Sequence, residues 1–315
     1  MIEYLYLVIG LVLLVAGANY LIKGSTNLAK RFGVSELIVG LIVLAFGTSL
    51  PELMVSVLSA LGGNTDIALG NVIGSNISNT LLILGLCAVI FPLVVKKSIA
   101  WKEIPLGILA VSSLVILSGE IVFGFTPVFG RFDGIIFLSL FLVFLYYSYK
   151  SLKVHKVVTV DIKKNKDFLT ALMILGGLAA VLFGGHLIVD NAVLIANKVG
   201  ISQFLVSATI IAIGSSLPEL VVSLVAIFKK KANLAIGNIV GSNIFNIFYI
   251  LGITALIKPI TIPLFAFFDI TFLLITSLLL FASIFIGRKY AIGKSSGIIF
   301  LILYLIYLMI IIARG

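Results

Sequence analysis

Charged residues are scarce in this sequence of 315 residues: 11% are Asp, Glu, Lys or Arg, whereas 61% are hydrophobic. A typical soluble domain carries about 25% charged residues, so the scarcity excludes a water-soluble globular protein. Apolar stretches of about 20 residues recur along the whole chain instead, and each is long enough to cross a hydrocarbon core of about 30 Å as a helix. The sequence predicts a chain that is almost entirely membrane domain.

Cysteine and histidine are scarce too, with one Cys and two His. Cys87 alone can form neither a disulfide within one chain nor a cysteine metal cluster. A serine protease of the membrane interior needs a His beside its nucleophile, and both His155 and His186 lie far along the chain from the serine motifs described below. An enzyme acting within the membrane therefore stays only as an alternative of a different class.

Ten hydrophobic spans are predicted, and all are helices because their continuous apolar runs lack the alternation of membrane barrel strands. The first span follows no basic segment and is interpreted as a true span rather than a signal peptide. Residues 151–167 form the longest polar connector, which we interpret as a linker. The expected fold is an all-α polytopic membrane protein. The approximate spans are 4–22, 36–61, 67–94, 104–121, 133–149, 168–190, 203–228, 233–257, 266–286 and 296–313.

The net charge of +10 could suggest a nucleic-acid partner, but its distribution indicates a membrane instead. Eighteen of the 22 Lys and Arg residues fall in one set of alternate loops, and only Arg131, Lys198, Lys258 and Arg314 fall in the other. Basic residues concentrate on the cytoplasmic side of membrane proteins, and they attract anionic lipid. The pattern predicts a plasma (inner) membrane protein with both termini outside and the linker in the cytoplasm.

The sequence repeats itself at a distance of 167 residues. Residues 33–53 match residues 200–220 at 10 of 21 positions, and residues 68–85 match residues 235–252 at 11 of 18. Each predicted half, 1–150 and 168–315, contains five spans. Because five is odd, the second half enters the membrane from the opposite side. Inverted repeats are typical of secondary transporters, whose sites lie near the midplane where the halves meet.

Proline interrupts the second and seventh spans within one repeated motif, GTSLPE at 47–52 and GSSLPE at 214–219. Proline removes a backbone donor and clashes with the carbonyl four residues earlier, which frees the oxygens of Gly47 and Gly214. Such a break persists in lipid only where the freed groups face protein or a cavity. The polar side chains at the two breaks are Thr48, Ser49 and Glu52, and Ser215, Ser216 and Glu219.

The third and eighth spans carry a second repeated motif, GNVIGSNISN at 70–79 and GNIVGSNIFN at 237–246. A Ser and an Asn four residues apart in each copy share one helix face; they are Ser75 and Asn79, and Ser242 and Asn246. We expect these two spans, with the second and seventh, to be broken helices that form an ion-binding core. The other asparagines, Asn71, Asn76, Asn238 and Asn243, are expected to bond the backbone rather than an ion.

The predicted core offers carboxylates, hydroxyls, carboxamides and carbonyls, with no His or Cys nearby. Calcium prefers six to eight oxygen ligands, whereas zinc and copper prefer nitrogen or sulfur. Sodium is the other natural occupant. Magnesium fits less well because it keeps its waters and requires a rigid octahedron.

Charge balance favours exchange. Glu52 and Glu219 are predicted to be the only acidic residues deep in any span, where a charged side chain costs roughly 3 kcal/mol or more. One calcium ion, two sodium ions or two protons cancel both charges, so one cation leaves as others replace it. This indicates an antiporter, and protons are expected to compete with calcium. A calcium/proton antiporter and a cation channel remain alternatives.

The two motifs, each present twice, resemble those of the sodium/calcium exchanger branch of the calcium/cation antiporter superfamily, in its compact prokaryotic-type form. The resemblance covers all ten spans. It implies sodium/calcium exchange by alternating access, with the first and sixth spans moving past the core, no enzymatic activity and no cofactor; no obligatory protein partner is evident. The metal ligands that it implies are Thr48, Ser49, Glu52, Ser75, Asn79, Ser215, Ser216, Glu219, Ser242 and Asn246, with the carbonyls of Ala45 and Ala212.

Two positions qualify the resemblance. Ser215 stands where the family often has Thr, which keeps the hydroxyl. Asn246 stands where potassium-dependent exchangers have Asp and potassium-independent animal-type exchangers have Asn, so the resemblance favours potassium independence. The calcium/proton branch carries a different pattern around its glutamates.

Overall fold

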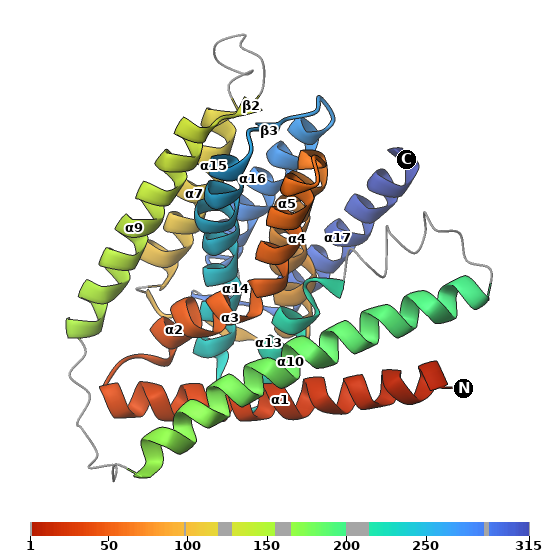
Figure 1. The fold of residues 1–315 in the computed structure, drawn as a ribbon. Coiled ribbons are helices and arrows are strands. Elements are labelled where there is room, and N and C mark those ends of the chain that lie inside the picture. The colour runs from red at the N-terminus through yellow and green to blue at the C-terminus, as the bar shows by residue number, and fades with distance from the viewer. Residues whose placement is uncertain are drawn as a thin grey trace.

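The computed structural model describes residues 2–97, 99–118, 128–154, 165–199, 214–286 and 290–314, and nearly all of them are helical (Figure 1). Within these ranges, eight helices are long and apolar enough to cross a membrane. A ninth candidate is the pair Glu36–Thr48 and Leu50–Leu61, bent by 43° at its break, and Leu217–Phe228 is a shorter apolar helix. These segments agree with the ten predicted spans; the predicted start of the seventh span, 203–213, lies outside the described residues.

The first half contains α1 (Ile2–Phe32), α2 (Glu36–Val39), α3 (Ala45–Thr48), α4 (Leu50–Leu61), α5 (Thr65–Ile77), α6 (Leu84–Ile90), α7 (Ile104–Leu117) and α9 (Arg131–Val154). The second contains α10 (Asn165–Lys198), α13 (Leu217–Phe228), α14 (Ala232–Ile244), α15 (Gly252–Ile257), α16 (Ala266–Ser283) and α17 (Lys294–Arg314). The π-helical segments are η1 (Gly40–Leu44), η2 (Ser78–Ile83), η3 (Ile99–Glu103) and η5 (Phe245–Leu251). Two-residue strands are β1 (Leu93–Val94), β2 (Val128–Phe129), β3 (Ile260–Thr261) and β4 (Ala291–Ile292).

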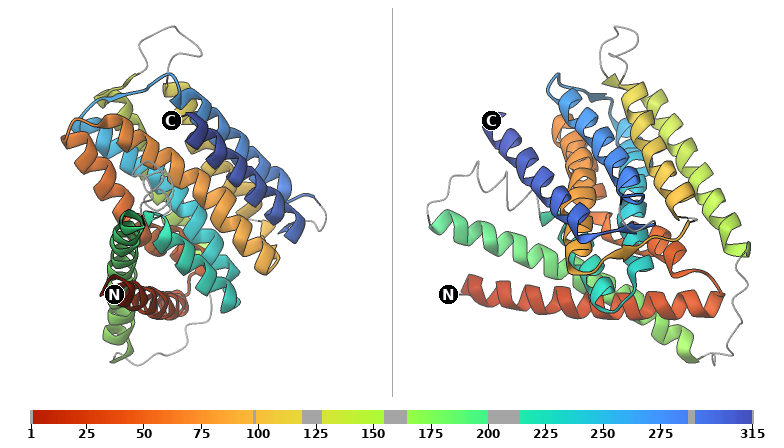
Figure 2. Two further views of the ribbon diagram at one scale, coloured as in Figure 1. Left: turned by 90° about the vertical axis from the view of Figure 1, so that its right-hand side faces the viewer. Right: turned by 180° about the vertical axis from the view of Figure 1, so that it is seen from behind.

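Helices α1 and α10 are longer than the predicted spans 4–22 and 168–190 because hydropathy marks only the apolar part of a helix. Figures 1 and 2 show both lying across one side of the remaining bundle, packed along each other. Glycines permit this close approach: a Cβ at Gly17 would lie 2.7 Å from the Gly177 oxygen, and one at Gly184 would lie 2.7 Å from the Gly10 oxygen. Small residues at such crossings let helix backbones touch in membranes.

The repeat of 167 residues seen in the sequence recurs in the secondary structure. Helices α4 and α13 begin and end at positions 167 apart, and so do α5 and α14; β1 and β3 do the same. The side-chain bond from Asn71 Nδ2 to Ser56 Oγ, 2.9 Å, has its counterpart between Asn238 Nδ2 and Ser223 Oγ, 3.1 Å. The two halves therefore fold their motif-bearing segments alike.

Contacts between loops agree with the predicted threading. Strand β1 pairs antiparallel with β4, and β2 pairs with β3. The ion pair between Glu36 and Lys231 joins two connections predicted on one side, and the pair between Glu3 and Lys198 joins two predicted on the other, each at 2.6 Å. In each case an even number of predicted spans separates the two partners along the chain. An even number of crossings returns the chain to the same face of the membrane, so each contact joins two loops on one face.

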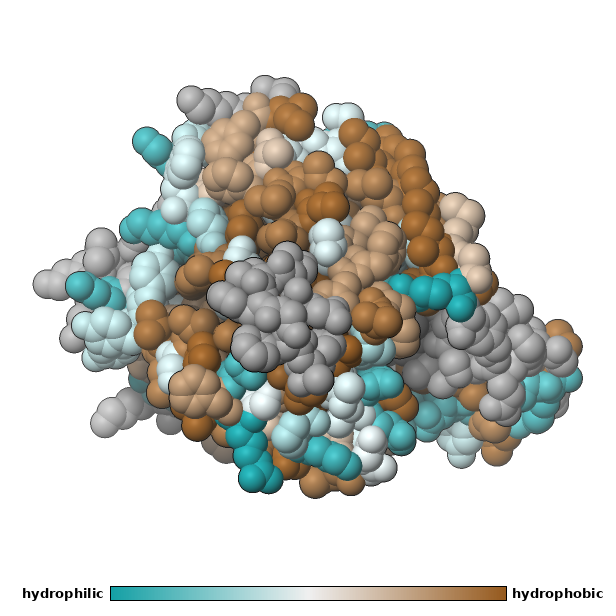
Figure 3. Space-filling model, turned by 90° about the horizontal axis from the view of Figure 1, so that it is seen from above, coloured by the Kyte–Doolittle hydropathy of each residue, from teal (hydrophilic) through white to brown (hydrophobic). Residues whose placement is uncertain are grey.

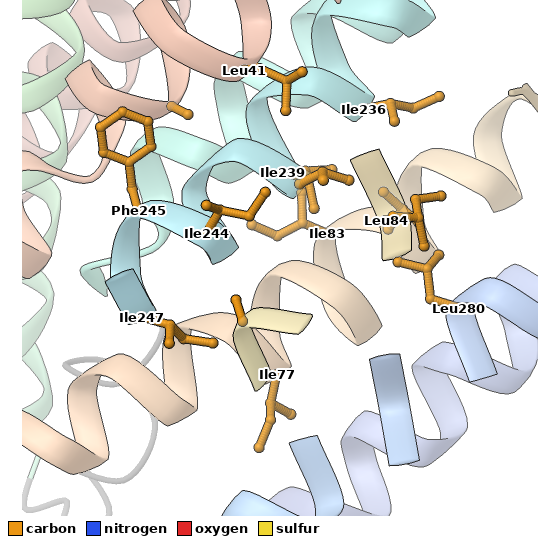
Figure 4. Packing of buried hydrophobic residues seen from close by; sticks show 14 of the residues in the cluster. Leu41, Ile77, Ile83, Leu84, Ile236, Ile239, Ile244, Phe245, Ile247 and Leu280 are labelled. Carbon is orange, nitrogen blue, oxygen red and sulfur yellow. The ribbon is translucent and has the colours of Figure 1, made fainter. Parts of the chain in front are cut away.

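The helices of the second motif form the centre of the molecule. The spans Thr65–Ile90 and Ala232–Ile257 are 72% and 78% buried, against 22–39% for the other six long spans. Figure 4 shows apolar side chains from both spans, Ile77 and Ile244 among them, within one buried cluster. Outer helices expose large apolar side chains, for example Leu142 at 65% and Leu175 at 66%, and Figure 3 shows broad hydrophobic areas on the face in view. Such surfaces suit contact with lipid chains rather than water.

Candidate ion-binding site

The first repeated motif sits where helix direction changes. Helix α3 ends at Thr48, and α4 starts at Leu50 with Pro51 in its first turn. Ser49, between them, has φ −83° and ψ 9°, and its counterpart Ser216 has φ −88° and ψ 5°. Proline is well suited to the first turn of a helix because N–H groups in that turn have no acceptor within the helix, so the N–H that proline lacks costs no hydrogen bond. The first motif copy thus ends one helix and starts another, and the second copy starts α13 in the same way.

The two carboxylates lie at these helix starts. Glu52 is in the first turn of α4 and Glu219 in the first turn of α13, and each is only 1% exposed. The hydroxyl of Ser49 donates to Glu219 Oε1 at 3.2 Å, which links the two halves. The hydroxyl of Ser75 lies 3.5 Å from Glu52 Oε1.

The second motif supplies carboxamides at the starts of π-helical segments. Asn79 lies in η2 and Asn246 in η5, and both are buried, at 1% and 0% exposed. The predicted interruption of the third and eighth spans takes this form, a widened turn inside a continuous helix rather than a sharp bend. Wide turns of this kind often mark functional sites because they shift side chains out of helical register.

A set of carboxamide bonds crosses between the halves. Asn79 Nδ2 donates to Asn243 Oδ1 at 3.0 Å, and Asn246 Nδ2 donates to Asn76 Oδ1 at 2.9 Å. The two bonds are counterparts under the repeat of 167 residues. Because Nδ2 of Asn79 and Nδ2 of Asn246 both donate hydrogen bonds, the Oδ1 atom of each side chain is left to bind an ion between the halves.

Six of the predicted ligand residues carry a buried oxygen that, within the described part of the chain, has no hydrogen-bond partner. They are Glu52 and Glu219 (Oε2), Asn79 and Asn246 (Oδ1), and Ser216 and Ser242 (Oγ). Buried polar atoms are nearly always bonded, and leaving one unpaired costs about 1–3 kcal/mol. Two of these oxygens come from the first half and four from the second, so both halves contribute to the donor set of an oxygen-coordinated cation.

The remaining predicted ligands are placed less uniformly. The hydroxyl of Thr48 lies 3.0 Å from the Leu44 oxygen and 3.1 Å from Asn238 Oδ1, so protein groups already engage it. The Ala45 oxygen accepts the Ser49 N–H at 3.1 Å, although a carbonyl has a second lone pair. Ser215 is half-buried, and Ala212 lies outside the described residues.

Two further acids are buried, Glu103 at 4% and Asp269 at 7% exposed. Glu103 precedes α7 and Asp269 is in the first turn of α16, so neither lies deep within a span. The prediction for the other four asparagines needs correction. The neighbouring asparagines bond side chains as well as backbone: only Asn71 and Asn76 donate to main-chain oxygens, and Asn71 also donates to Ser56.

The composition of the site distinguishes ion classes. Among the described residues no group of three or more His, Cys, Asp or Glu is placed to hold a metal. The predicted ligand groups are all oxygens, from carboxyl, hydroxyl, carboxamide and carbonyl groups, and oxygens suit hard cations rather than zinc or copper.

Comparison with known proteins agrees with this geometry. The profile of the family described as "Sodium/calcium exchanger protein" matches residues 2–150 and 169–313. The chain belongs to the sodium/calcium exchanger family. Members of this family are transporters, so the protein is an ion-transporting membrane protein and not an enzyme.

Full-length relatives support the assignment to the family. The putative antiporter CaxA of Alkalimonas amylolytica is 36% identical over 313 residues, 96% of each chain. The sodium/calcium exchanger MaX1 of Methanosarcina acetivorans is 29% identical over 355 residues, 98% of each chain. A solved structure of the sodium-calcium exchanger NCX_Mj, soaked with sodium and calcium, superposes with a TM-score of 0.83 at 33% identity over 97% of both chains.

Proposed function

We propose that this protein exchanges sodium for calcium across the plasma (inner) membrane by alternating access, without potassium. The observation that carries the proposal is the group of six buried oxygens without a hydrogen-bond partner among the described residues, two from the first half and four from the second, which includes the carboxylates of Glu52 and Glu219. Calcium and sodium are the transported ions that bind at this site. The protein's outer surface contacts the surrounding lipid.

Calcium and sodium both fit the donor set. Two carboxylates balance one calcium or two sodium ions, while hydroxyl and carboxamide oxygens complete a coordination of six or more. We assign the metal-ligand role to the hydroxyl, carboxyl and carboxamide groups of both motifs and to the carbonyls of Ala45 and Ala212. The names of the relative MaX1 and of NCX_Mj, both called sodium/calcium exchangers, support sodium rather than protons as the counter-ion.

Exchange follows from the cost of the empty site. With both carboxylates buried at 1% exposure, an unoccupied site would carry two uncompensated charges through the membrane interior, where each costs roughly 3 kcal/mol or more. The site therefore changes its exposure only when loaded. The bond between Ser49 and Glu219 joins the two halves at the site, which supports movement of the first and sixth spans past an intact core.

Potassium independence rests on Asn246. Its neutral carboxamide leaves the site with two carboxylates, so a third monovalent charge has no partner there. We assign residues 1–150 and 168–315 to the two inverted five-helix repeats, 151–167 to a cytoplasmic linker, and both termini to the outside.

The test is calcium uptake by proteoliposomes loaded with sodium, compared with vesicles loaded with potassium or choline, and repeated with an outward proton gradient. The proposal expects uptake only with internal sodium, and no change when potassium is added to it. Uptake driven by the proton gradient alone would show that the protein is a calcium/proton antiporter instead. A requirement for potassium would contradict the role given to Asn246.

A further inference from the structure

We propose that Thr80 is a positioning residue for ion binding, which fixes the orientation of the Asn79 carboxamide by holding Asn243. The inference rests on the proposed function, because it concerns how one ligand of that site is held. Thr80 lies outside both the proline motif and the Ser–Asn pair of the second motif.

Three side chains form a relay, of which Asn243 is half-buried. Thr80 Oγ1 accepts a bond from Asn243 Nδ2 at 3.0 Å, and Asn243 Oδ1 accepts one from Asn79 Nδ2 at 3.0 Å. Thr80 is fully buried and Asn79 is 1% exposed. In this arrangement the hydroxyl holds the NH₂ end of Asn243, which leaves Asn243 Oδ1 to accept from Asn79. Asn79 Oδ1 is then left for the ion site.

The orientation matters because the two ends of a carboxamide have opposite polarity. Its oxygen ligates a cation, whereas its NH₂ group repels one. With Nδ2 of Asn79 donated to Asn243, Oδ1 is left without a partner among the described residues and directed to the site. If Asn243 turned over, its NH₂ group would oppose that of Asn79, and Asn79 would gain by turning over too.

The second half holds its ligand differently. Asn246 donates to Asn76 Oδ1 at 2.9 Å, and Asn76 Nδ2 donates to the main-chain oxygen of Asn243 at 3.2 Å. The position 167 residues after Thr80 is Ile247, which has no hydroxyl. One ligand carboxamide is thus anchored on the backbone and the other on a single side-chain hydroxyl, so the relay through Thr80 is the one that a substitution can break.

The surroundings of Thr80 allow a clean substitution. Thr80 and Asn243 line a cavity of about 20 Å³ together with apolar side chains that include Ile104, Val111 and Leu280. A valine methyl in place of the hydroxyl meets these apolar walls, and the two side chains have nearly the same shape.

The experiment measures calcium affinity by isothermal titration of the detergent-purified protein, which needs no counter-ion, for Thr80→Val and Thr80→Ser. Loss of a partner that orients a metal ligand typically weakens binding 10- to 100-fold. We expect Thr80→Val to bind calcium at least tenfold more weakly and Thr80→Ser to stay within twofold of wild type. The Michaelis constant for calcium uptake should rise in parallel, with the maximal rate within about twofold.

Thr254→Val is the matched control, because Thr254 is fully buried and its hydroxyl donates only to the Ile250 oxygen of its own helix, at 2.7 Å. If Thr80→Val does not fold, Thr80→Ala removes the same hydroxyl and is expected to show the same loss. Equal affinities of Thr80→Val and wild type, equal losses in the valine and serine variants, or an equal loss in Thr254→Val would each overturn the proposal. A wild type that binds calcium but shows no sodium-driven uptake would contradict the proposed exchange while leaving this test intact.

Discussion

At the scale of single residues, the account depends on Glu52 and Glu219. Replacing either with Gln removes the charge that balances the cation while keeping the shape, so we predict a loss of calcium uptake of at least 100-fold in proteoliposomes. Glu103→Gln is the control, since Glu103 is also buried, at 4% exposed, but accepts a hydrogen bond from Tyr147 rather than from a residue of the site. It should keep uptake within about threefold of wild type, and a comparable loss there would show that any buried carboxylate is required.

Protonation of the same carboxylates gives a pH dependence with a definite sign. Each proton bound in the site removes one negative charge that calcium needs, so lowering the pH should reduce calcium uptake. Raising the calcium concentration should reverse the loss if protons and calcium compete for one site. Uptake rates at a series of pH values and calcium concentrations test this, and inhibition that calcium cannot relieve would contradict direct competition.

The sequence predicted a set of candidate ligand residues but not how their side chains are held. Spacing of four residues placed Ser75 beside Asn79 on one face, and the structure buries both. Spacing within one helix carries no information about bonds between helices, so the cross-half pair of Asn79 and Asn243 and the role of Thr80 could not be derived. The repeat offered one signal of a distinct role for Thr80, because Ile247 occupies the equivalent position in the second half, so the halves differ there.

At the scale of elements, the crossing of α1 and α10 should tolerate no added methyl groups. A Cβ at Gly177 would lie 2.8 Å from the Gly17 oxygen, whereas one at the adjacent Gly176 would meet nothing within 4 Å. Overpacking costs about 1–3 kcal/mol, so Gly177→Ala should lower the melting temperature in detergent and slow transport. Gly176→Ala should have neither effect. Identical behaviour of the two variants would contradict the close crossing and its role.

Hydrophobic runs predicted the inner helices well because they are apolar on all sides. The predicted bounds 36–61 coincide with the ends of α2 and α4, and 233–257 lies within one residue of the helix Ala232–Ile257. The π-helical segments η2 and η5 could not be predicted, because they depend on packing between helices rather than on local pattern. Helices α1 and α10 were underestimated because their ends carry polar residues.

At the scale of the whole molecule, the loop contacts define two faces, and the charge pattern predicts which one is cytoplasmic. Cys87 is fully buried, so Cys87→Ser gives a background free of cysteine. In that background Lys258→Cys should react with a membrane-impermeant maleimide in intact cells, and Lys229→Cys only in inverted vesicles. Both lysines are exposed. The opposite labelling pattern would reverse the assigned orientation.

The central claim is that the carboxylates of two halves form one site that cannot cross the membrane empty. The most direct measurement is calcium efflux from calcium-loaded proteoliposomes into a medium without sodium or calcium, compared with media that contain either ion, with the membrane potential clamped. The account predicts negligible efflux into the cation-free medium, and rapid efflux once sodium or calcium is added outside. Efflux at full rate into the cation-free medium would show a channel or uniporter and contradict the account.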